Sequence, residues 1–448
     1  MRLLGHRAVP RLLRENRPFR SFFAAQTISL FGDQVTLIAL PLTAVLVLDA
    51  GPAEMGYLTA AGLLPHLFFA LHAGAWVDRH GRRRHTMVAA DLGRAAIVVA
   101  APIAYAFDVL TIQQLYVTEF LMGTLSVLFF VSYNTLFISL VAREQYVEGQ
   151  SLLNGSRAMS YVAGPSIGGL LVKLLSAPVT LLVDAVSYVL SAAFLGRISP
   201  VEPPAETAER GHIVAGLRFI VRSPIMRASL GATATINFFN FVFFSLFILY
   251  ATRELGVGPG LLGAILGAGA VGGLIGSVVT GRVGRRIGIG PAYIVGCVLF
   301  PAPLLLVPLA GGPQPVVLAL LFLAEFGSGL GVMMLDISAG VIFAALIPDR
   351  LRSRVSGAYM AVNYGVRPLG SLAGGALGAT IGLRPTLWIA TVGALGGVLF
   401  LLPSPVPRLR DLPEPEEGND AVPPEQRARA GALRGREDRE VADAELRG

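Results

Sequence analysis

The chain has 448 residues, of which 54% are hydrophobic and 15% are charged, and its formal net charge is +7. Its mean hydropathy of +0.65 means that one soluble core could not bury its apolar surface, which excludes an ordinary soluble enzyme. The single cysteine, Cys297, excludes an intrachain disulfide framework and any cysteine-based zinc or iron–sulfur site.

Long apolar segments dominate the chain. A helix that crosses a bilayer needs about 20 apolar residues, so the stretch from Phe19 to Pro403 can supply roughly a dozen spans with short loops. The sequence therefore predicts an all-α membrane protein with twelve transmembrane helices. Breaks in hydropathy place these helices near residues 19–48, 56–77, 86–107, 112–140, 151–175, 179–198, 225–250, 259–280, 288–309, 315–346, 355–381 and 384–403.

The basic residues are almost all arginines in loops and tails, where they are expected to set topology rather than to bind nucleic acid. They gather in the N-terminal leader and in alternate loops, so the positive-inside rule places both termini in the cytoplasm. We expect a cytoplasmic leader at 1–18, an N-terminal six-helix bundle at 19–198, a cytoplasmic linker at 199–224, a C-terminal six-helix bundle at 225–403 and a disordered cytoplasmic tail at 404–448. Within the linker, residues 213–221 predict a surface helix.

An internal repeat appears when the chain is shifted by about 206 residues. Glu119 then falls on Glu325, and further matches join Gly123 to Gly329, Phe137 to Phe343, Gly168 to Gly374 and Gly169 to Gly375. These matches indicate two six-helix pseudo-repeats, an arrangement that brackets a site near the middle of the membrane.

The first span carries a polar stripe. Gln26, Ser29, Asp33 and Thr36 follow one another at spacings of three, four and three residues, which places them on one helical face. We expect this stripe to line a central cavity.

The loop between the second and third spans has a specific order of glycine and charge. Gly74, Asp78, Arg79, Gly81 and Arg82 lie in the segment Gly74-Ala-Trp-Val-Asp78-Arg79-His-Gly81-Arg82-Arg83-Arg84. It resembles the signature loop of the major facilitator superfamily, and the resemblance implies a role for these residues in conformational gating. The alternative is a basic loop that only holds orientation in the membrane.

The fifth span contains Gly164-Pro165-Ser166-Ile167-Gly168-Gly169. This segment resembles the core of the antiporter motif of export-type members of the superfamily, and it implies gating by Gly164, Pro165, Gly168 and Gly169. Proline interrupts the helical hydrogen bonds, and the glycines give a smooth face on which the other half can rock. The alternative is an ordinary site of helix packing.

Three further segments resemble the third drug:proton antiporter family, which includes macrolide efflux and enterobactin export proteins. They are Ser29-Leu-Phe-Gly32-Asp33, the Asp184-Ala-Val-Ser-Tyr stretch of the sixth span and the linker segment 216–224. The resemblance implies that the first, fourth, seventh and tenth spans line the cavity. Glu119 departs from the pattern, because many drug antiporters have an arginine at this position.

Acidic residues within spans are costly and usually face a cavity or a partner. A carboxyl group in a partly dry cavity can take up a proton on one side of the membrane and release it on the other. Asp33 is the first candidate for this role, and Glu119, Glu325 and Asp336 follow. Glu119 and Glu325 could instead pair with a base such as Arg367. Asp91 and Arg94, one turn apart, are expected to form a structural pair or to act as a partner for the loop between the second and third spans.

The remaining cavity candidates are polar or aromatic: Gln26, Ser29, Phe130, Tyr133, Asn237, Asn240 and Phe244. They suit an amphipathic substrate, and the acids favour a cationic or neutral compound over an anion.

Export of a drug or metabolite in exchange for protons is therefore the leading function, and we expect a monomer in the plasma (inner) membrane, embedded in lipid, with no cofactor and no metal. A siderophore or lipid-product exporter and a nutrient uptake symporter remain alternatives. An enzyme is not expected, because the sequence has no nucleophile elbow, phosphate-binding loop or metal-ligand cluster.

Overall fold

The structure is a computed structural model that describes residues 10–199 and 213–410. Within these ranges it is built of helices and contains no strand. The first bundle contains α1 (Arg11–Glu15), α2 (Arg17–Leu46), α3 (Pro52–His80), α4 (Arg83–Ala106), α5 (Ile112–Leu140), α6 (Tyr146–Leu175) and α7 (Ala177–Gly196). The second contains α8 (Ile213–Arg222), α9 (Pro224–Arg253), α10 (Pro259–Ile287), α11 (Ile289–Leu299), α12 (Leu306–Leu309), α13 (Gln314–Leu346), α14 (Arg352–Ile381) and α15 (Leu383–Gly396).

Length and composition allow 10 helices of the described ranges to cross a membrane. The helices α3 and α14 are not among them, although they have 29 and 30 residues. In α14, Arg352, Arg354 and Arg367 lower the apolar character of the helix. The predicted all-α membrane protein is confirmed, whereas the count of twelve spans stays a prediction.

Local sequence sets the ends of the long helices. Asn16 caps α2 by accepting a hydrogen bond from the backbone N–H of Phe19, and Thr111 forms a capping box with Gln114 at the start of α5. Gly81 ends α3 in the left-handed conformation, with φ of 61°. These capping residues set the ends of the helices. The observed ends lie within a few residues of those that hydropathy predicted.

Prolines break the predicted ninth span into pieces. The helix α11 ends at Leu299, a short 3-10 turn follows at Pro303–Leu305, and α12 completes the segment. Proline lacks the backbone N–H that an α-helix needs at this point, so Pro301 and Pro303 account for the interruption.

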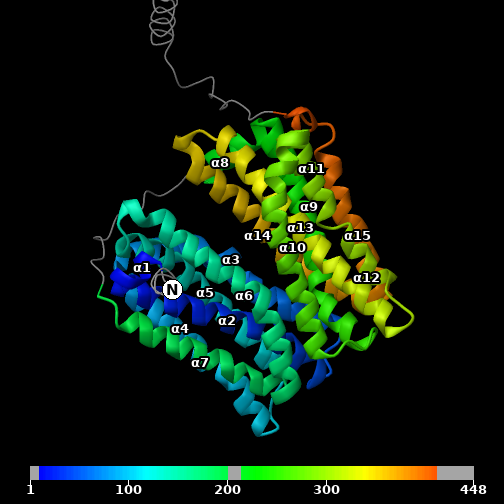
Figure 1. The fold of residues 1–448 in the computed structure, drawn as a ribbon. Coiled ribbons are helices and arrows are strands. Elements are labelled where there is room, and N and C mark those ends of the chain that lie inside the picture. The colour runs from blue at the N-terminus through cyan, green and yellow to red at the C-terminus, as the bar shows by residue number, and fades with distance from the viewer. Residues whose placement is uncertain (1–9, 200–212, 411–448) are drawn as a thin grey trace, which may run out of the picture.

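The two bundles have corresponding helix contacts. In the first, α2 packs on α6 and α7, and α5 packs on α3 and α4; in the second, α9 packs on α14 and α15, and α13 packs on α10 and α11. Between the bundles, α6 packs on α10 and α3 packs on α14. Figure 1 shows the bundles meeting along these helices and diverging toward the ends that carry α1 and α8. This correspondence is what a duplicated fold would give; the pseudo-repeat itself stays a prediction.

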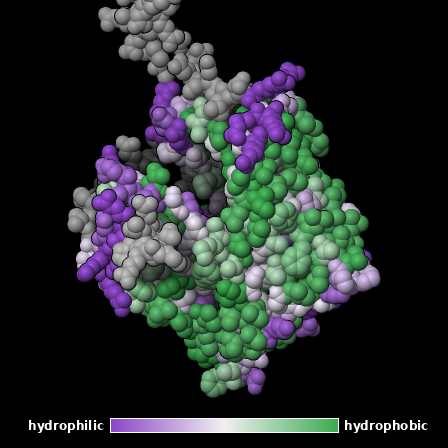
Figure 2. Space-filling view, in the orientation of Figure 1, coloured by the Kyte–Doolittle hydropathy of each residue, from purple (hydrophilic) through white to green (hydrophobic). Residues whose placement is uncertain are grey.

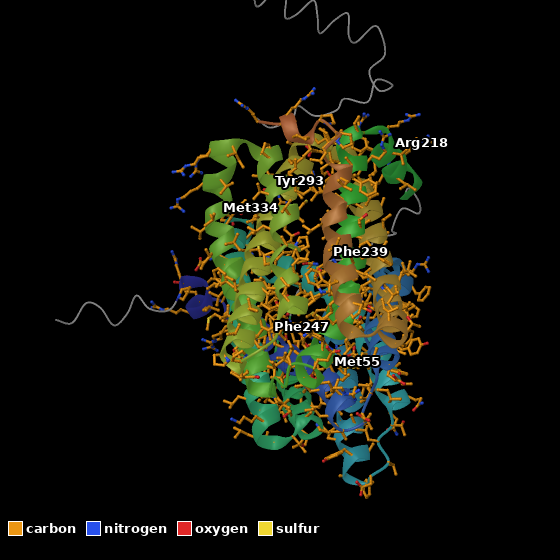
Figure 3. The ribbon with its side chains drawn as sticks, turned by 90° about the vertical axis from the view of Figure 1, so that its right-hand side faces the viewer. Met55, Arg218, Phe239, Phe247, Tyr293 and Met334 are labelled. Carbon is orange, nitrogen blue, oxygen red and sulfur yellow. The ribbon has the colours of Figure 1, made fainter. Side chains whose placement is uncertain are left out.

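The apolar core explains this shape. At one end a single core joins both bundles and includes Leu40, Met55, Phe247 and Leu321. At the other end each bundle has a core of its own, one around Phe22 and the other around several residues of α9, α13 and α14. In Figure 3, Met55 and Phe247 lie toward the end away from Arg218 of α8. We call the first end the joined end.

The other end, where the bundles separate, is rich in arginine, and we call it the open end. Its arginines come from the start of α2, the turn between α3 and α4, the ends of α8 and α10, the start of α14 and the segment after α15. Figure 2 shows hydrophilic side chains gathered at these ends, apolar side chains along the flank of the second bundle, and a hollow between the bundles. We call this hollow the chamber.

Both chain segments flanking the bundles pack more closely than the sequence indicated. In the leader, Leu12 is buried, its backbone N–H donates to Glu148 Oε1 at 3.2 Å, and Asn16 Nδ2 donates to the carbonyl of Leu140 at 2.8 Å. The prediction of disorder from residue 404 is wrong for 404–410: Val406 is buried, and the carbonyl of Leu409 accepts from the N–H at the start of α11 at 2.9 Å. Apolar side chains and one backbone bond order these seven residues. The rest of the tail lies outside the described residues.

The linker helix predicted at 213–221 is present as α8. It packs on the start of α14, where Gly216 lies against the backbone of Arg354. Any side chain at Gly216 would meet that backbone, so glycine permits the contact. The first part of the linker lies outside the described residues.

Candidate functional site

Charged side chains meet where α2, α4 and α7 pack together. They are Asp33, Asp91, Arg94 and Asp184, and we call them, with Tyr188, the acidic cluster. Arg94 and Asp91 form an ion pair one helical turn apart, and Arg94 Nη1 lies 3.9 Å from Asp33 Oδ1. The cluster therefore places three carboxyl groups near one guanidinium within the spans of the first bundle.

Reciprocal hydrogen bonds join α2 to α7 in this cluster. Tyr188 Oη donates to Asp33 Oδ1 at 2.6 Å, and Thr36 Oγ1 donates to Asp184 Oδ2 at 2.5 Å. Each helix thus supplies one carboxyl group and one hydroxyl group to the other. Gly32 allows this approach, because a Cβ there would lie 2.7 Å from the Cβ of a serine on α7.

The guanidinium of Arg94 is enclosed by aromatic rings. It lies 4.4 Å from the ring centroids of both Phe129 and Tyr188, and its side chain is only 3% exposed. Asp91 is fully buried and accepts a second hydrogen bond from Ser191 at 2.7 Å. A buried cation is tolerated when it has carboxylate partners and ring faces around it.

Asp33 is the member of the cluster that reaches the surface. Its side chain is 36% exposed, whereas the side chain of Asp91 and the whole of Asp184 are 0% exposed. If Asp33 takes up a proton, Arg94 still has Asp91 as its partner. The cluster can therefore gain or lose one proton at Asp33 without leaving a buried charge unpaired.

Glu119 and Glu325 occupy matching places in the two bundles. A Cβ on Gly62 of α3 would lie 2.5 Å from a carboxyl oxygen of Glu119, and a Cβ on Gly269 of α10 would lie 3.3 Å from a carboxyl oxygen of Glu325. Neither glutamate has a hydrogen bond or ion pair within the described part of the chain. Each lies behind a helix that contacts the other bundle, and neither pairs with Arg367 as the sequence had allowed.

The second bundle contains two adjoining cavities with volumes of about 410 and 260 Å³. Both are lined by Asn237, Asp336 and Arg367, together with residues of α9 and α13. Asn240 lines the smaller one. Among the predicted residues, Asn237, Asn240 and Asp336 thus line these adjoining cavities, while Asp33 lies in the other bundle.

Other predicted cavity residues lie elsewhere in the helices. Gln26 and Ser29 are buried, and Tyr133 stacks on Phe22 with ring centroids 5.3 Å apart. Phe130 is exposed, as is Phe244, whose ring packs on Phe241. Of the polar stripe on α2, Asp33 and Thr36 contact residues of α7. The role of the stripe in lining a cavity stays a prediction.

The glycine–proline segment of α6 lies at the joined end, between the two bundles. A Cβ on Gly169 would lie 3.1 Å from the Cα of Gly263 on α10, and the carbonyl of Pro165 approaches the same glycine. On its other side the segment meets α2, where a Cβ on Gly164 would lie 2.5 Å from the Cβ of Gln34, and one on Gly168 would lie 3.1 Å from a backbone atom of α2. These glycines allow three helices to pack backbone to backbone.

The signature loop lies at the end of α3 and the turn before α4. Gly74, Asp78 and Arg79 lie in α3, Gly81 ends it, and Arg82 precedes α4. The side chain of Asp78 lies outside the described residues. Arg84, in the first turn of α4, donates a hydrogen bond to the carbonyl of Ile198 at 2.5 Å. This bond connects the start of α4 to the segment that follows α7. The gating role of the loop stays a prediction.

The sequence did not predict the partners of Asp33. Asp184 and Tyr188 lie one turn apart on α7, with a serine between them, and this spacing of polar residues within an apolar span was a usable signal. The sequence predicted a pair between Arg94 and Asp91 but no contact of Arg94 with Asp33. This second carboxylate comes from α2, which no local pattern indicates.

Two comparisons of the sequence point to one family. A model described as Major Facilitator Superfamily matches residues 22–367 and 230–437. The multidrug efflux pump Tap of Mycolicibacterium fortuitum is 28% identical over 87% of this chain and 95% of its own. The MFS-type transporter YfiS of Bacillus subtilis is 27% identical over 83% of this chain and 89% of its own.

Solved structures have the same fold at low sequence identity. The nucleoside transporter NupG aligns with a TM-score of 0.70 at 12% identity, covering 86% of this chain and 99% of its own. A bacterial homologue of the iron transporter ferroportin, in an inward-facing state, aligns with a TM-score of 0.68 at 18% identity, covering 88% of this chain and 99% of its own. The chain belongs to the major facilitator superfamily.

Proposed function

We propose that this transporter exports an amphipathic drug or metabolite in exchange for inward-moving protons, by alternating access. The observation that carries the proposal is the acidic cluster, in which the partly exposed Asp33 shares Arg94 with the buried Asp91. The similarity to multidrug efflux pumps supports export over uptake. The charges of the open end support a cytoplasmic placement of that end and of both termini, in the plasma membrane.

The proton cycle follows from the cluster. When the joined end opens, Asp33 takes up a proton from outside, and Arg94 stays paired with Asp91. After the chamber turns to the cytoplasm, Asp33 releases the proton and regains its interaction with Arg94. Substrate enters the chamber from the cytoplasm in the conformation described above, with the joined end closed.

Glu119 and Glu325 are the second pair of proton-coupling candidates. Each lies behind a helix of the closed interface, α3 or α10, and has no partner of its own within the described residues. Uptake of a proton there would accompany opening of the joined end, because that movement changes the packing of α3 and α10.

Inverted membrane vesicles provide the test. An amphipathic cationic dye should accumulate in them when the interior is made acidic, and collapse of the proton gradient should stop it. Asp33→Asn should reduce gradient-driven transport at least tenfold, whereas Asp108→Asn, an exposed loop acid, should leave it unchanged.

Three results would contradict parts of the proposal. Full gradient-driven transport by Asp33→Asn would remove Asp33 from the proton path. Accumulation driven by the opposite gradient would favour the uptake symporter instead. Transport restricted to one siderophore or lipid in place of dyes would favour the product exporter.

A further inference from the structure

The cavities of the second bundle carry two opposite charges that face the same space. Asp336 of α13 and Arg367 of α14 line both cavities, and the other lining residues are uncharged. Asp336 is exposed, and it has no ion pair or hydrogen bond within the described residues. The two side chains therefore share a space without neutralising one another through a direct contact.

The guanidinium of Arg367 is held in a fixed orientation. Its Nε donates to Asn237 Oδ1 at 3.1 Å, and its Cζ lies 4.1 Å from the ring centroid of Tyr364 and 5.3 Å from that of Phe241. Asn237 Nδ2 in turn donates to Asn363 Oδ1 at 3.1 Å. Two linked amides, of which Asn363 is buried, thus hold a cation that lines the cavities and has no ion pair with a carboxylate in the described part of the chain.

Aromatic and apolar side chains form the rest of the walls. Phe343 packs edge-on against Tyr359, with ring centroids 4.9 Å apart, and Tyr359 Oη hydrogen-bonds Thr233 Oγ1 at 2.6 Å. Met360 and Phe300 complete these walls. Such walls fit the flat body of an aromatic compound, while its charged groups need partners of opposite sign.

We propose that this site selects dipolar amphipathic compounds, in which Arg367 binds an anionic group and Asp336 binds a cationic group. The proposal rests on the proposed function, because it takes these cavities as part of the substrate path. It corrects the expectation of a purely cationic or neutral substrate, since a base as well as an acid lines the site. A guanidinium and a carboxylate separated across one cavity match a zwitterion better than a single charge.

A matched pair of dyes tests this inference. Rhodamine B carries a cationic ring system and a carboxylate, and its ethyl ester keeps the cation but lacks the negative charge. Binding to the purified full chain in lipid nanodiscs is measured by fluorescence polarisation, with empty nanodiscs as the blank. The zwitterion should bind about tenfold more tightly than the ester, because one charge-assisted contact is lost in the ester.

Variants assign the two charges. Arg367→Gln should abolish the preference for the zwitterion and leave ester binding within about twofold of wild type, which also shows that the variant is folded. Asp336→Asn should weaken both dyes about tenfold. Asp349→Asn, an exposed loop acid, is the control and should change neither affinity.

Equal wild-type affinities for the two dyes overturn the proposal, as does no binding of the zwitterion. A preference for the zwitterion that survives Arg367→Gln also overturns it. Gradient-driven efflux of a purely cationic dye is measured in parallel. If that efflux persists while the preference is absent, only the substrate selectivity proposed here fails and the proposed export function stands.

Discussion

At the scale of single residues, the acidic cluster is held by contacts between helices rather than within them. Tyr188 of α7 donates to Asp33 of α2, and Arg94 of α4 lies between Asp33 and Asp91. A hydrogen bond to a charged group contributes about 1.5–3 kcal/mol, so each contact also stabilises the bundle.

The Tyr188–Asp33 bond predicts coupled effects on stability. Tyr188→Phe and Asp33→Asn should each lower the free energy of unfolding by about 1–3 kcal/mol, and the double variant should lose less than the sum. Titration with sodium dodecyl sulfate in mixed micelles measures these values. Tyr57→Phe, an exposed tyrosine of α3, is the control and should change stability little. Additive losses in the double variant would show that the bond is not formed.

Local sequence predicted much at this scale and missed the rest for a physical reason. Asp33 could be singled out because a carboxylate inside a span is costly. Asp91 and Arg94 could be paired because they are one turn apart. The approach of Arg94 to Asp33, and the carboxyl group of Asp184 beside Thr36, depend on how α2, α4 and α7 pack. Local patterns in a single sequence do not reveal how these helices pack.

At the scale of elements, hydropathy predicted the positions of the helices to within a few residues, but it did not predict the break near Pro303 in the ninth segment. Composition misjudged residues 404–410, where two apolar side chains suffice to dock the chain on α11. It also could not indicate which ends of the bundles join, because that depends on matching small residues of α3 with α14 and of α6 with α10.

Small residues at the joined end predict a conformational effect. Gly169→Leu should wedge α6 away from α10, because even a Cβ there would lie 3.1 Å from the Cα of Gly263. Efflux should fall at least tenfold, and the joined end should open. Gly155→Leu on the same helix is the control, since a Cβ there has no atom within 4 Å.

A reporter cysteine distinguishes opening from misfolding. Ser371, which is fully buried and borders Gly56 of α3, is replaced by cysteine in a background with Cys297→Ala. An impermeant maleimide added from outside should label Ser371→Cys several-fold faster when Gly169→Leu is present. Unchanged labelling with lost efflux would mean that the wedge does not open this end.

At the scale of the whole molecule, one shared core at the joined end and two separate cores at the open end define a hinged pair of bundles. The second bundle repeats the helix contacts of the first, and Glu119 and Glu325 lie behind glycines of α3 and α10 at matching places. The proposed alternating access would require the shared core to divide and re-form, since the chamber cannot open to the other side while the core is intact.

A crosslink between the bundles should therefore stop transport. Asp49 and Arg253 form an ion pair that joins the two bundles at the joined end, with their side chains 96% and 35% exposed. Cysteines at both positions, in the Cys297→Ala background, are joined with a short bismaleimide that contains a cleavable disulfide. Efflux should fall to background, and reduction of the linker should restore it, because only the rocking movement has been blocked.

Two measurements distinguish a blocked movement from a damaged protein. Dye should still bind from the open end, since the crosslink holds the conformation in which the chamber faces that end. Each single-cysteine variant, treated with the same reagent, should transport normally, because one modified residue, in the turn after α2 or at the end of α9, leaves the bundles free. Normal efflux by the fully crosslinked protein would show that the joined end does not open during transport, and the two bundles would then have to pass substrate without dividing their common core.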